Sequence, residues 1–342
     1  MGKLKDVSVI VRDSESGKVY DLSNALESVI WQTHRIASQA GSLEVMVKDK
    51  PDSEIVISPG SFIRFGVDGT YYFYGNIEEN QLMVSAQEGT LNRIVAYDHK
   101  YLLKSTENRY RREGMTGSEF FDEAMTVFNA KIRSMGDVGV SHAVIEPSTA
   151  RLRDYYFAVS TLYTMFKETL SETHAAERGQ NLYMIRDNLG TLEWRSLLAL
   201  RKHYVLGDAS YTDSYTYTHT LRDTYNSIKV YRDNEELRKR DIWSRYDSEN
   251  ISKWRYRQLT LQAAGYMSDA EISDMIDLYL SAHNRTSRTM QMACLGINGL
   301  QAGDGIQVRA AKGKIDHGVW CESVAHAYTE QGHMMDISIG TI

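Results

Sequence analysis

The chain has 342 residues, of which 42% are hydrophobic and 25% are charged, and its formal net charge is −6. This balance excludes a disordered or fibrous protein, and the length predicts two or three domains. The acidic balance argues against a general nucleic-acid-binding protein, which needs a basic excess or a basic face.

Targeting and redox signals are sparse in the sequence. We find no N-terminal apolar run of the signal-peptide type and no segment near the ~20 apolar residues that span a bilayer. We therefore expect the protein to be made and folded in the cytoplasm, without a membrane partner. Cys294 and Cys321 fall inside predicted strands, where we expect them to be small apolar residues rather than a disulfide.

Residues 1–105 are predicted to form an antiparallel β domain. Segment 5–12 opens as a strand and is followed by the polar turn 13–17. The pair Asp68-Gly69 predicts a tight hairpin between 62–67 and 71–77. The other strand-like segments are 30–34, 42–48 and 91–98.

Residues 106–205 are predicted to form a small α+β domain. Thr116 and Glu119 have the spacing of a capping box, and apolar residues follow at helical spacing. A second helix is expected over 160–178, and a hairpin joins 181–185 to 191–195.

The remaining residues are predicted to form a second β domain from 206–240 and 285–342, interrupted by a helical insertion over 241–284. Segment 213–232 alternates regularly and is expected to pair with two C-terminal hairpins. One expected hairpin pairs 289–295 with 306–309 through the turn Gly303-Asp304-Gly305, and the other pairs 318–328 with 335–339. A second capping box, Ser268 to Glu271, opens a helix of the insertion.

Two groups of residues could in principle carry chemistry. His326, His333 and Asp336 lie on or beside one hairpin and could share a metal, but no metal-ligand spacing accompanies them, which favours a solvated sheet face. Ser160, His174 and Glu177 could form a nucleophile with its base, but they lie on one predicted helix without a nucleophile elbow, which favours helix surface.

Other patterns favour structural roles. The glycine-rich segments 296–299 and 303–305 do not join a strand to a helix, so they predict turns rather than phosphate loops. The tyrosines clustered at 71–74 and 211–231 predict sheet packing or interfaces rather than base or sugar stacking. The basic runs 109–112 and 238–240 predict solvated loops or protein contacts. We therefore predict no catalytic, cofactor-binding or metal-binding residue.

The order of these parts, together with four segments, resembles a known family. The segments are 73–77 (FYGNI), 96–105 (AYDHKYLLKS), 299–304 (GLQAGD) and 322–326 (ESVAH). They resemble the XkdQ-type tail proteins of PBSX-like prophages, which are contractile-tail baseplate hub proteins akin to myophage hubs and to the base of VgrG.

The resemblance implies an α+β, mainly β fold, with two tube-like antiparallel β-barrel domains that flank the small α+β domain and superimpose on each other. It implies a non-enzymatic homotrimer that forms a pseudo-sixfold ring between the sixfold tail tube and the threefold central spike. The partners would be the tube protein, the spike protein and other baseplate proteins of a phage tail or tailocin, with no stable nucleic-acid binding. The alternative is a tail-tip protein that binds or degrades the cell wall through its tyrosine-rich strands.

Overall fold

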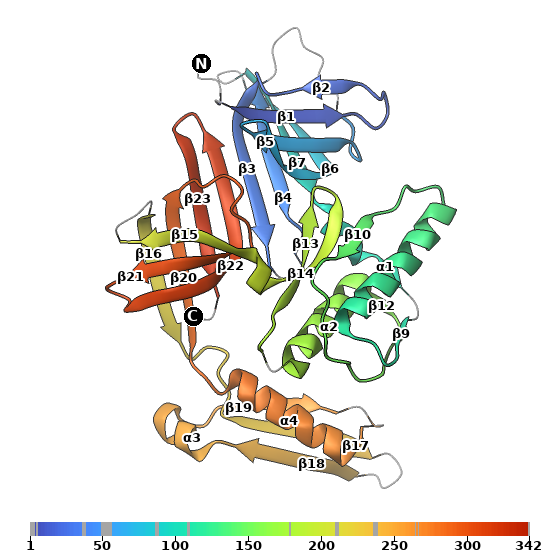
Figure 1. Cartoon of the computed structure of the whole chain (residues 1–342), viewed down its shortest axis with the longest axis vertical. Helices are drawn as coiled ribbons and strands as arrows, with labels where there is room; N and C mark the ends of the chain where they lie inside the picture. Colours follow the sequence, from blue (N-terminus) through green and yellow to red (C-terminus); the bar gives the residue numbers. More distant parts are fainter. Residues whose placement is uncertain are drawn as a thin grey trace. The chain divides into compact units, whose positions relative to one another are not determined.

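The computed structural model describes residues 4, 6–35, 39–48, 57–85, 89–107, 110–177, 179–208, 212–234, 239–263, 265 and 267–340. It divides into two compact units (Figure 1). The larger unit comprises Met1–Tyr215 and Gln291–Ile339, and the smaller comprises Thr216–Met290 with Gly340–Ile342. Strands predominate over helices, which confirms the predicted α+β, mainly β class.

A 13-stranded sheet forms the framework of the larger unit, and its strands β16 and β20 continue into the residue range of the smaller unit. Its strand order is β16-β20-β23-β22-β3-β4-β7-β6-β5-β1-β2, and β21 joins β15 to β22 off this path. The strands are β1 (Val7–Arg12), β2 (Val19–Asp21), β3 (Leu26–His34), β4 (Ser42–Lys48), β5 (Phe62–Val67), β6 (Thr70–Ser85), β7 (Gly89–Tyr97), β15 (Arg201–Gly207), β16 (Thr212–Thr220), β20 (Ser287–Leu295), β21 (Gly305–Ala310), β22 (Ile315–Thr329) and β23 (Gly332–Ile339).

Alternating side chains give this sheet one buried face. In β4 the residues Leu43, Val45 and Val47 have no exposed surface, while the residues between them are half-buried. A period of two is what a strand with one face on a core requires. Cys294 and Cys321 are also buried, as free thiols, which agrees with the prediction that they form no disulfide.

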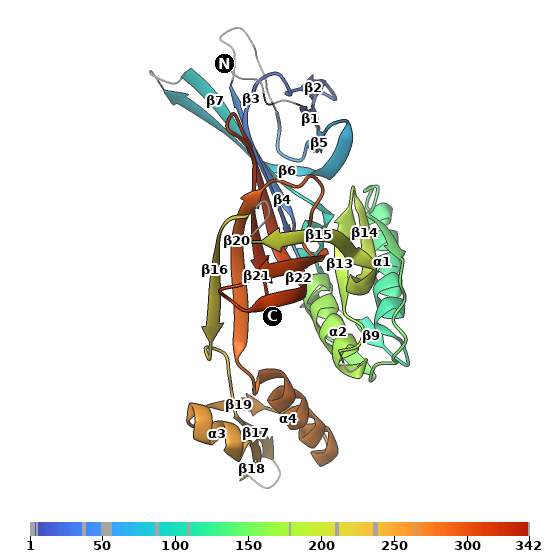
Figure 2. The same cartoon turned by 60° about the vertical axis from the view of Figure 1, so that its left-hand side comes forward.

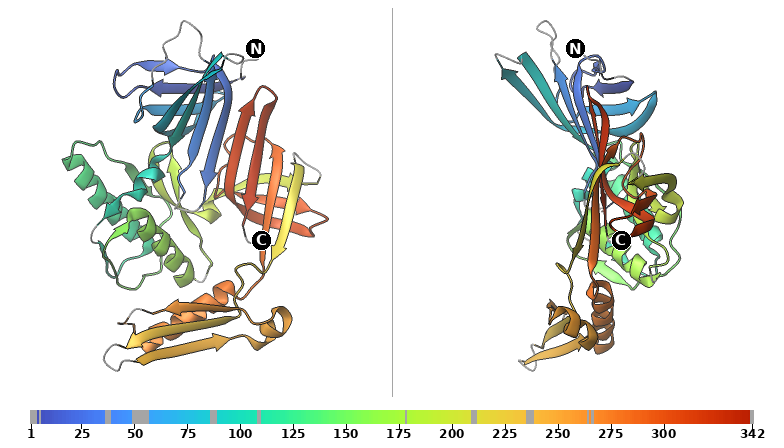
Figure 3. Two further views of the ribbon diagram at one scale, coloured as in Figure 1. Left: turned by 180° about the vertical axis from the view of Figure 1, so that it is seen from behind. Right: turned by 90° about the vertical axis from the view of Figure 1, so that its left-hand side faces the viewer.

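The N-terminal and C-terminal strands meet at β3 and β22. These strands pair antiparallel over a register that runs from Ser323 with His34 to Tyr328 with Val29. Figure 3 shows β3 and β4 beside β22 and β23 within the same sheet. The two β ranges expected from the sequence are therefore continuous in their hydrogen bonding.

The middle of the larger unit is a small α+β layer. Figure 2 shows α1 and α2 beside β13 and β14. The core lies between the helices and the sheet β10-β14-β13, where Phe121, Phe166 and Trp194 are fully buried. The predicted capping box is confirmed, because Thr116 accepts from Glu119 N and the Glu119 side chain accepts from Thr116 N. The elements are η1 (His99–Lys104), β8 (Thr106–Glu107), β9 (Tyr110–Arg112), α1 (Gly117–Ser134), β10 (Ser141–Val144), β11 (Tyr155–Phe157), β12 (Ser160–Thr161), α2 (Leu162–Ala176), β13 (Tyr183–Asn188), β14 (Thr191–Ser196) and η2 (Leu197–Leu200).

The smaller unit has a core of its own. Helix α4 packs on one face of the sheet β18-β17-β19, where Ile228, Val230, Ile272 and Ile276 are buried. The capping box predicted at Ser268 is present. The elements are β17 (Ser227–Asn234), β18 (Lys239–Tyr246), α3 (Ser248–Trp254), β19 (Gln258–Gln262) and α4 (Asp269–His283).

Two expectations about strand pairing and one about the helical insertion need correction. The hairpin expected between 289–295 and 306–309 is wrong, because β20 neighbours β23 whereas β21 pairs parallel with β15 and antiparallel with β22. The pairing expected for 213–232 holds for β16, which neighbours β20, but β17 pairs with β18 and β19. The insertion expected to be helical contains α3 and α4 but also most of β18 and all of β19, because a local hairpin already satisfies β17.

Candidate functional site

His326 and His333 form a pair on the core side of the sheet. His326 has no exposed surface, and its Nδ1 lies 2.9 Å from His333 Nε2 while its Nε2 lies 2.7 Å from Leu300 O. Because a carbonyl can only accept, His326 Nε2 carries the hydrogen and Nδ1 accepts from His333. Burial lowers the pKa of each histidine to about 4. The expected solvated face is wrong for His326, because the register places it beside Trp31.

Asp336 lies on the opposite face of the sheet from His326. It is exposed and pairs in register with Ala325, the neighbour of His326, and successive strand residues point to opposite faces. The three residues therefore cannot share one metal ion. Over the described ranges, no group of three or more His, Cys, Asp and Glu residues is arranged to hold a metal.

His174 and Glu177 each make a structural contact through the side chain, whereas Ser160 is placed by strand pairing. His174 Nε2 accepts from Tyr183 N across 2.8 Å, and burial lowers the pKa of this histidine. Glu177 is buried and accepts from the Tyr183 hydroxyl across 3.2 Å, so the helix-surface interpretation is wrong for it. Ser160 lies in β12, where Glu107 is its register partner. The His174 and Glu177 side chains therefore connect α2 and its C-terminal cap to Tyr183 of β13.

The basic runs are only partly solvated. Arg109 and Arg238 lie outside the described residues. Arg112 is 1% exposed, donates to Thr169 Oγ1 across 3.0 Å and pairs with Glu172. The expected solvated loop is therefore wrong for Arg112, whose guanidinium ties β9 to α2.

Two of the clustered tyrosines pack within the fold, as the sequence predicts, whereas Tyr71 is exposed and Tyr211 lies outside the described residues. Tyr72 stacks on Trp31 with ring centroids 5.7 Å apart, and Tyr231 lies under the Arg240 guanidinium at 4.2 Å. Such contacts use the aromatic faces within the fold.

A first side-chain clamp joins β13 to the turn before β21. Arg186 Nη1 lies 2.8 Å from Asp304 Oδ1, and Arg186 Nε lies 3.0 Å from Gln301 Oε1. Asp304 is fully buried. Gly303 adopts a φ of +87°, and a Cβ at this position would lie 2.1 Å from Met184 Sδ. The turn backbone thus lies directly against β13, and only glycine fits there without movement.

A second clamp joins the same hairpin to η1. Asp187 Oδ2 accepts from His99 N across 2.8 Å. Asp98 caps η1 by accepting from Lys100 N across 3.0 Å, and it also accepts from Gly41 N across 2.8 Å. Burial raises the pKa of Asp98 to about 7. The segments 96–105 and 299–304 therefore converge on the β13–β14 hairpin, which neither segment reveals when read alone.

The face of the sheet opposite the core, which we call the open face, is the broadest candidate surface. The open face is lined by half-buried or exposed side chains that alternate with the core residues. They include Ser28, Ile30 and Gln32 of β3, Ser42, Glu44, Met46 and Lys48 of β4, Arg93 and Val95 of β7, Glu79 and Gln81 of β6, Ala325 and Ala327 of β22, and Met334, Asp336 and Ser338 of β23.

The charges on the open face are mixed rather than basic. Arg93 lies between two carboxylates, with Nη2 2.6 Å from Glu44 and Nη1 3.5 Å from Glu79. Lys48 and Asp336 contribute one further charge of each sign. A face of this kind lacks the cation density that phosphate neutralisation requires.

The two ends of the sheet differ in how well they are protected. At one end β2 has only three residues, which limits pairing with another chain. At the other end β16 has nine residues, TDSYTYTHT, without a lysine, arginine or proline. A long end strand of tyrosine and threonine is a ready template for a further strand.

Sequence comparison identifies the family to which this architecture belongs. A family model described as YQBQ-like matches residues 29–340. The chain belongs to the YQBQ-like family. No curated protein matches this YQBQ-like chain in sequence.

Solved structures share the fold of this YQBQ-like chain over nearly its whole length. The 43 kDa tail protein of prophage MuSo2 from Shewanella oneidensis aligns with a TM-score of 0.70 at 13% identity, covering 97% of this chain and 98% of that one. A tail protein from Neisseria meningitidis aligns with a TM-score of 0.67 at 12% identity, covering 98% and 96%. Prophage tail protein gp18 from Listeria monocytogenes aligns with a TM-score of 0.58 at 14% identity, covering 97% and 94%.

The resemblance read from the sequence is thus confirmed for family and fold. In the part of the YQBQ-like chain that the structure describes, every helix is too short or too polar to cross a bilayer.

Proposed function

We propose that this YQBQ-like chain is a structural hub protein in the baseplate of a contractile phage tail or phage-tail-like particle, assembled in the host cytoplasm. The observation that carries the proposal is the continuous sheet, which has one face on the core and one open face of mixed polarity. Its support is the fold shared with two prophage tail proteins and a further tail protein.

The proposed assembly is a homotrimeric ring with pseudo-sixfold symmetry. Each chain contributes two ranges of β structure, joined edge to edge at β3 and β22. If each range acts as one tube-like domain, three chains supply six similar units, which allows a threefold spike protein to meet a sixfold tube protein. The unprotected β16 edge is the part of this chain that a neighbouring subunit would cover.

In this ring the open face lines the lumen. On that wall Arg93 is paired with Glu44 and Glu79, and Lys48 is matched in number by Asp336, so the residues named for this face carry no basic excess. DNA would therefore pass along it without the counterion release that drives stable binding.

The proposed role is structural rather than enzymatic. The buried His326–His333 pair, the anchor Glu177 and the clamp Arg186–Asp304 are all committed to internal contacts. A wall-degrading tail-tip protein needs two carboxylates or a metal in a cleft, with one group free to act on a glycan.

Two measurements test the proposal. Native mass spectrometry of the purified chain, alone and with tube protein, gives its subunit number, and electron microscopy of particles gives its position. Three copies on the axis between tube and spike are expected. A different copy number, or a position away from the axis, would refute the hub assignment.

A paired variant tests the role of the β16 edge. The exposed residues Thr216 and Thr218 are replaced together by lysine, which should leave the monomer folded and prevent ring closure. The control is Ser244→Lys at an exposed position of β18. Equal ring formation by both proteins would exclude β16 from the interface.

A further inference from the structure

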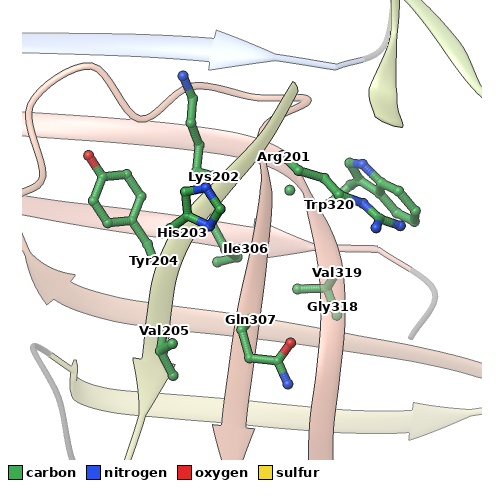
Figure 4. Close-up of a pocket in the computed structure, with 11 residues that line it drawn as sticks. Arg201, Lys202, His203, Tyr204, Val205, Ile306, Gln307, Gly318, Val319 and Trp320 are labelled. Carbon is green, nitrogen blue, oxygen red and sulfur yellow. The ribbon is translucent and has the colours of Figure 1, made fainter. Parts of the chain in front are cut away.

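A break in strand register opens a hollow beside β15. Arg201 pairs with Gly305 and Val205 pairs with Gln307, so four steps along β15 correspond to two steps along β21. The extra residues of β15 leave the ladder, as in a β-bulge. The resulting hollow has a volume of about 470 Å³ and is bordered by β15, β21 and β22 (Figure 4).

Two glycines, which have no side chains, contribute to the floor of this hollow. Gly305 is the register partner of Trp320, and Gly318 is the register partner of Gln307, so all four lie on one face. A Cβ at Gly318 would meet nothing nearer than Ile306 O at 3.9 Å. The open space above Gly318 therefore exists because glycine has no Cβ.

The lining of the hollow is basic and aromatic. Arg201, Lys202 and His203 contribute to it, and no carboxylate does. The Arg201 guanidinium carbon lies 5.8 Å from the Trp320 ring centroid. Both residues are labelled in Figure 4. Trp320 Nε1 donates to Leu197 O across 3.2 Å, which fixes the indole plane.

The positive charge of the lining is not neutralised by the rest of the described chain. Asp316 lies further along the same face, but its Oδ1 already accepts from Gln307 across 2.8 Å and from Arg309 across 3.2 Å. Within the described ranges, Arg201 and Lys202 have no ion-pair partner. Arg201 and Lys202 thus form a local positive charge in a chain whose net charge is −6, and a bound anion would neutralise it.

We propose that this hollow binds an acidic segment of a neighbouring protein, whose carboxylate pairs with Arg201 while an adjacent apolar side chain packs on Trp320. A planar guanidinium matches a carboxylate with two parallel hydrogen bonds. A volume of this size holds a few side chains. The hollow is confined, whereas nucleic acid requires cations that continue along a groove.

The probe is a labelled, capped peptide with a central glutamate flanked by leucines, and the matched peptide carries glutamine. Fluorescence anisotropy with the full chain should show at least tenfold tighter binding of the glutamate peptide. Arg201→Gln should reduce that affinity about tenfold, and Arg201→Lys should restore part of it. The control Lys18→Gln, at an exposed position of the N-terminal turn, should change nothing.

Filling the hollow gives an independent test. Gly318→Val adds methyl groups where the structure has open space, and valine suits a strand. The variant should retain the melting temperature of the parent and lose peptide binding at least tenfold. If its melting temperature falls, the Arg201 variants decide the question.

Three outcomes would overturn the proposal: equal affinity for the glutamate and glutamine peptides, unchanged binding by Arg201→Gln, or tighter binding of inorganic pyrophosphate than of the glutamate peptide. Binding is measured on the isolated chain, so its failure leaves the ring proposal standing. Failure of ring formation likewise leaves this site standing.

Discussion

Arg186 and Asp304 are separated by 118 positions in the chain, yet the Nη1 of the arginine lies 2.8 Å from the Oδ1 of the aspartate. The contact fastens the β13–β14 hairpin of the middle layer to the turn that begins β21. Asp304 is fully buried, so removal of Arg186 would leave its carboxylate without an ion-pair partner in the interior.

Replacing Arg186 by methionine should therefore be strongly destabilising. The variant leaves a buried carboxylate without its ion pair, and we expect the free energy of unfolding to fall by about 3 kcal/mol. Urea unfolding followed by tryptophan fluorescence measures this change. The control is Arg309→Met, whose pair with Asp316 is mostly exposed and should contribute less than about 1 kcal/mol. Equal shifts of the two midpoints would contradict the clamp.

Gly303→Ala should be costly for two separate reasons. Alanine is strained at a φ of +87°, and its Cβ would overlap Met184 Sδ. The matched control is Gly136→Ala, where φ is +97° and nothing lies within 4 Å. We expect the control to cost about 1 kcal/mol and Gly303→Ala about 1–3 kcal/mol more, as for overpacking. Thermal unfolding of both variants would show no difference if the turn did not lie against β13.

Acid should weaken the fold through the histidine pair. Burial lowers the pKa of His326 and His333 to about 4, below the ordinary value of 6.5. Between these values the unfolded chain binds protons that the folded chain does not, so stability is complete above about pH 6.5 and falls as the pH drops toward 4. His326 alone accounts for a loss on the order of 3 kcal/mol.

The measurement is urea unfolding from pH 7 to pH 4 for the parent and for the double variant His326→Gln, His333→Gln. Asp98 acts in the opposite sense in this window, because burial raises its pKa to about 7. The difference between the two proteins therefore isolates the histidines. A difference that does not vary with pH would show that the pair does not titrate as described.

Thr116→Ala should lower stability by about 1 kcal/mol, because the side chain caps α1 by accepting from Glu119 N. Thr116→Ser retains the oxygen and should stay within a few tenths of a kcal/mol of the parent. Circular dichroism during urea unfolding compares the two. Equal losses would assign the effect to the lost methyl group rather than to the cap.

Features whose partners are close in sequence could be predicted from the sequence. The capping boxes at Thr116 and Ser268 need a partner three residues away, and both are present. The hairpins β13–β14 and β22–β23 were likewise visible, because turn residues separate two short strand-like segments. In each case the stabilising contact lies inside one window of the sequence.

Features with distant partners could not be predicted. His326 has the polar character of a surface residue, and its burial depends on Trp31, a register partner from the opposite end of the chain. Arg112 was expected in solvent because nothing near it signals Thr169 or Glu172. Similarly, β21 lacks any local sign that β15 is its parallel partner.

The pairing of β3 with β22 can form only late in translation, after β22 has been synthesised. Thr33 and Val324 are register partners 291 positions apart. At ~5–20 residues per second, the first strand waits roughly 15–60 s for the other to be synthesised. During that interval the edge of β3 that pairs with β22 in the native sheet has no native partner for its backbone donors and acceptors. Successive ribosomes on one messenger RNA hold several nascent chains close together at this stage. The misassembly expected from this connectivity is therefore exchange of the C-terminal hairpin between neighbouring chains.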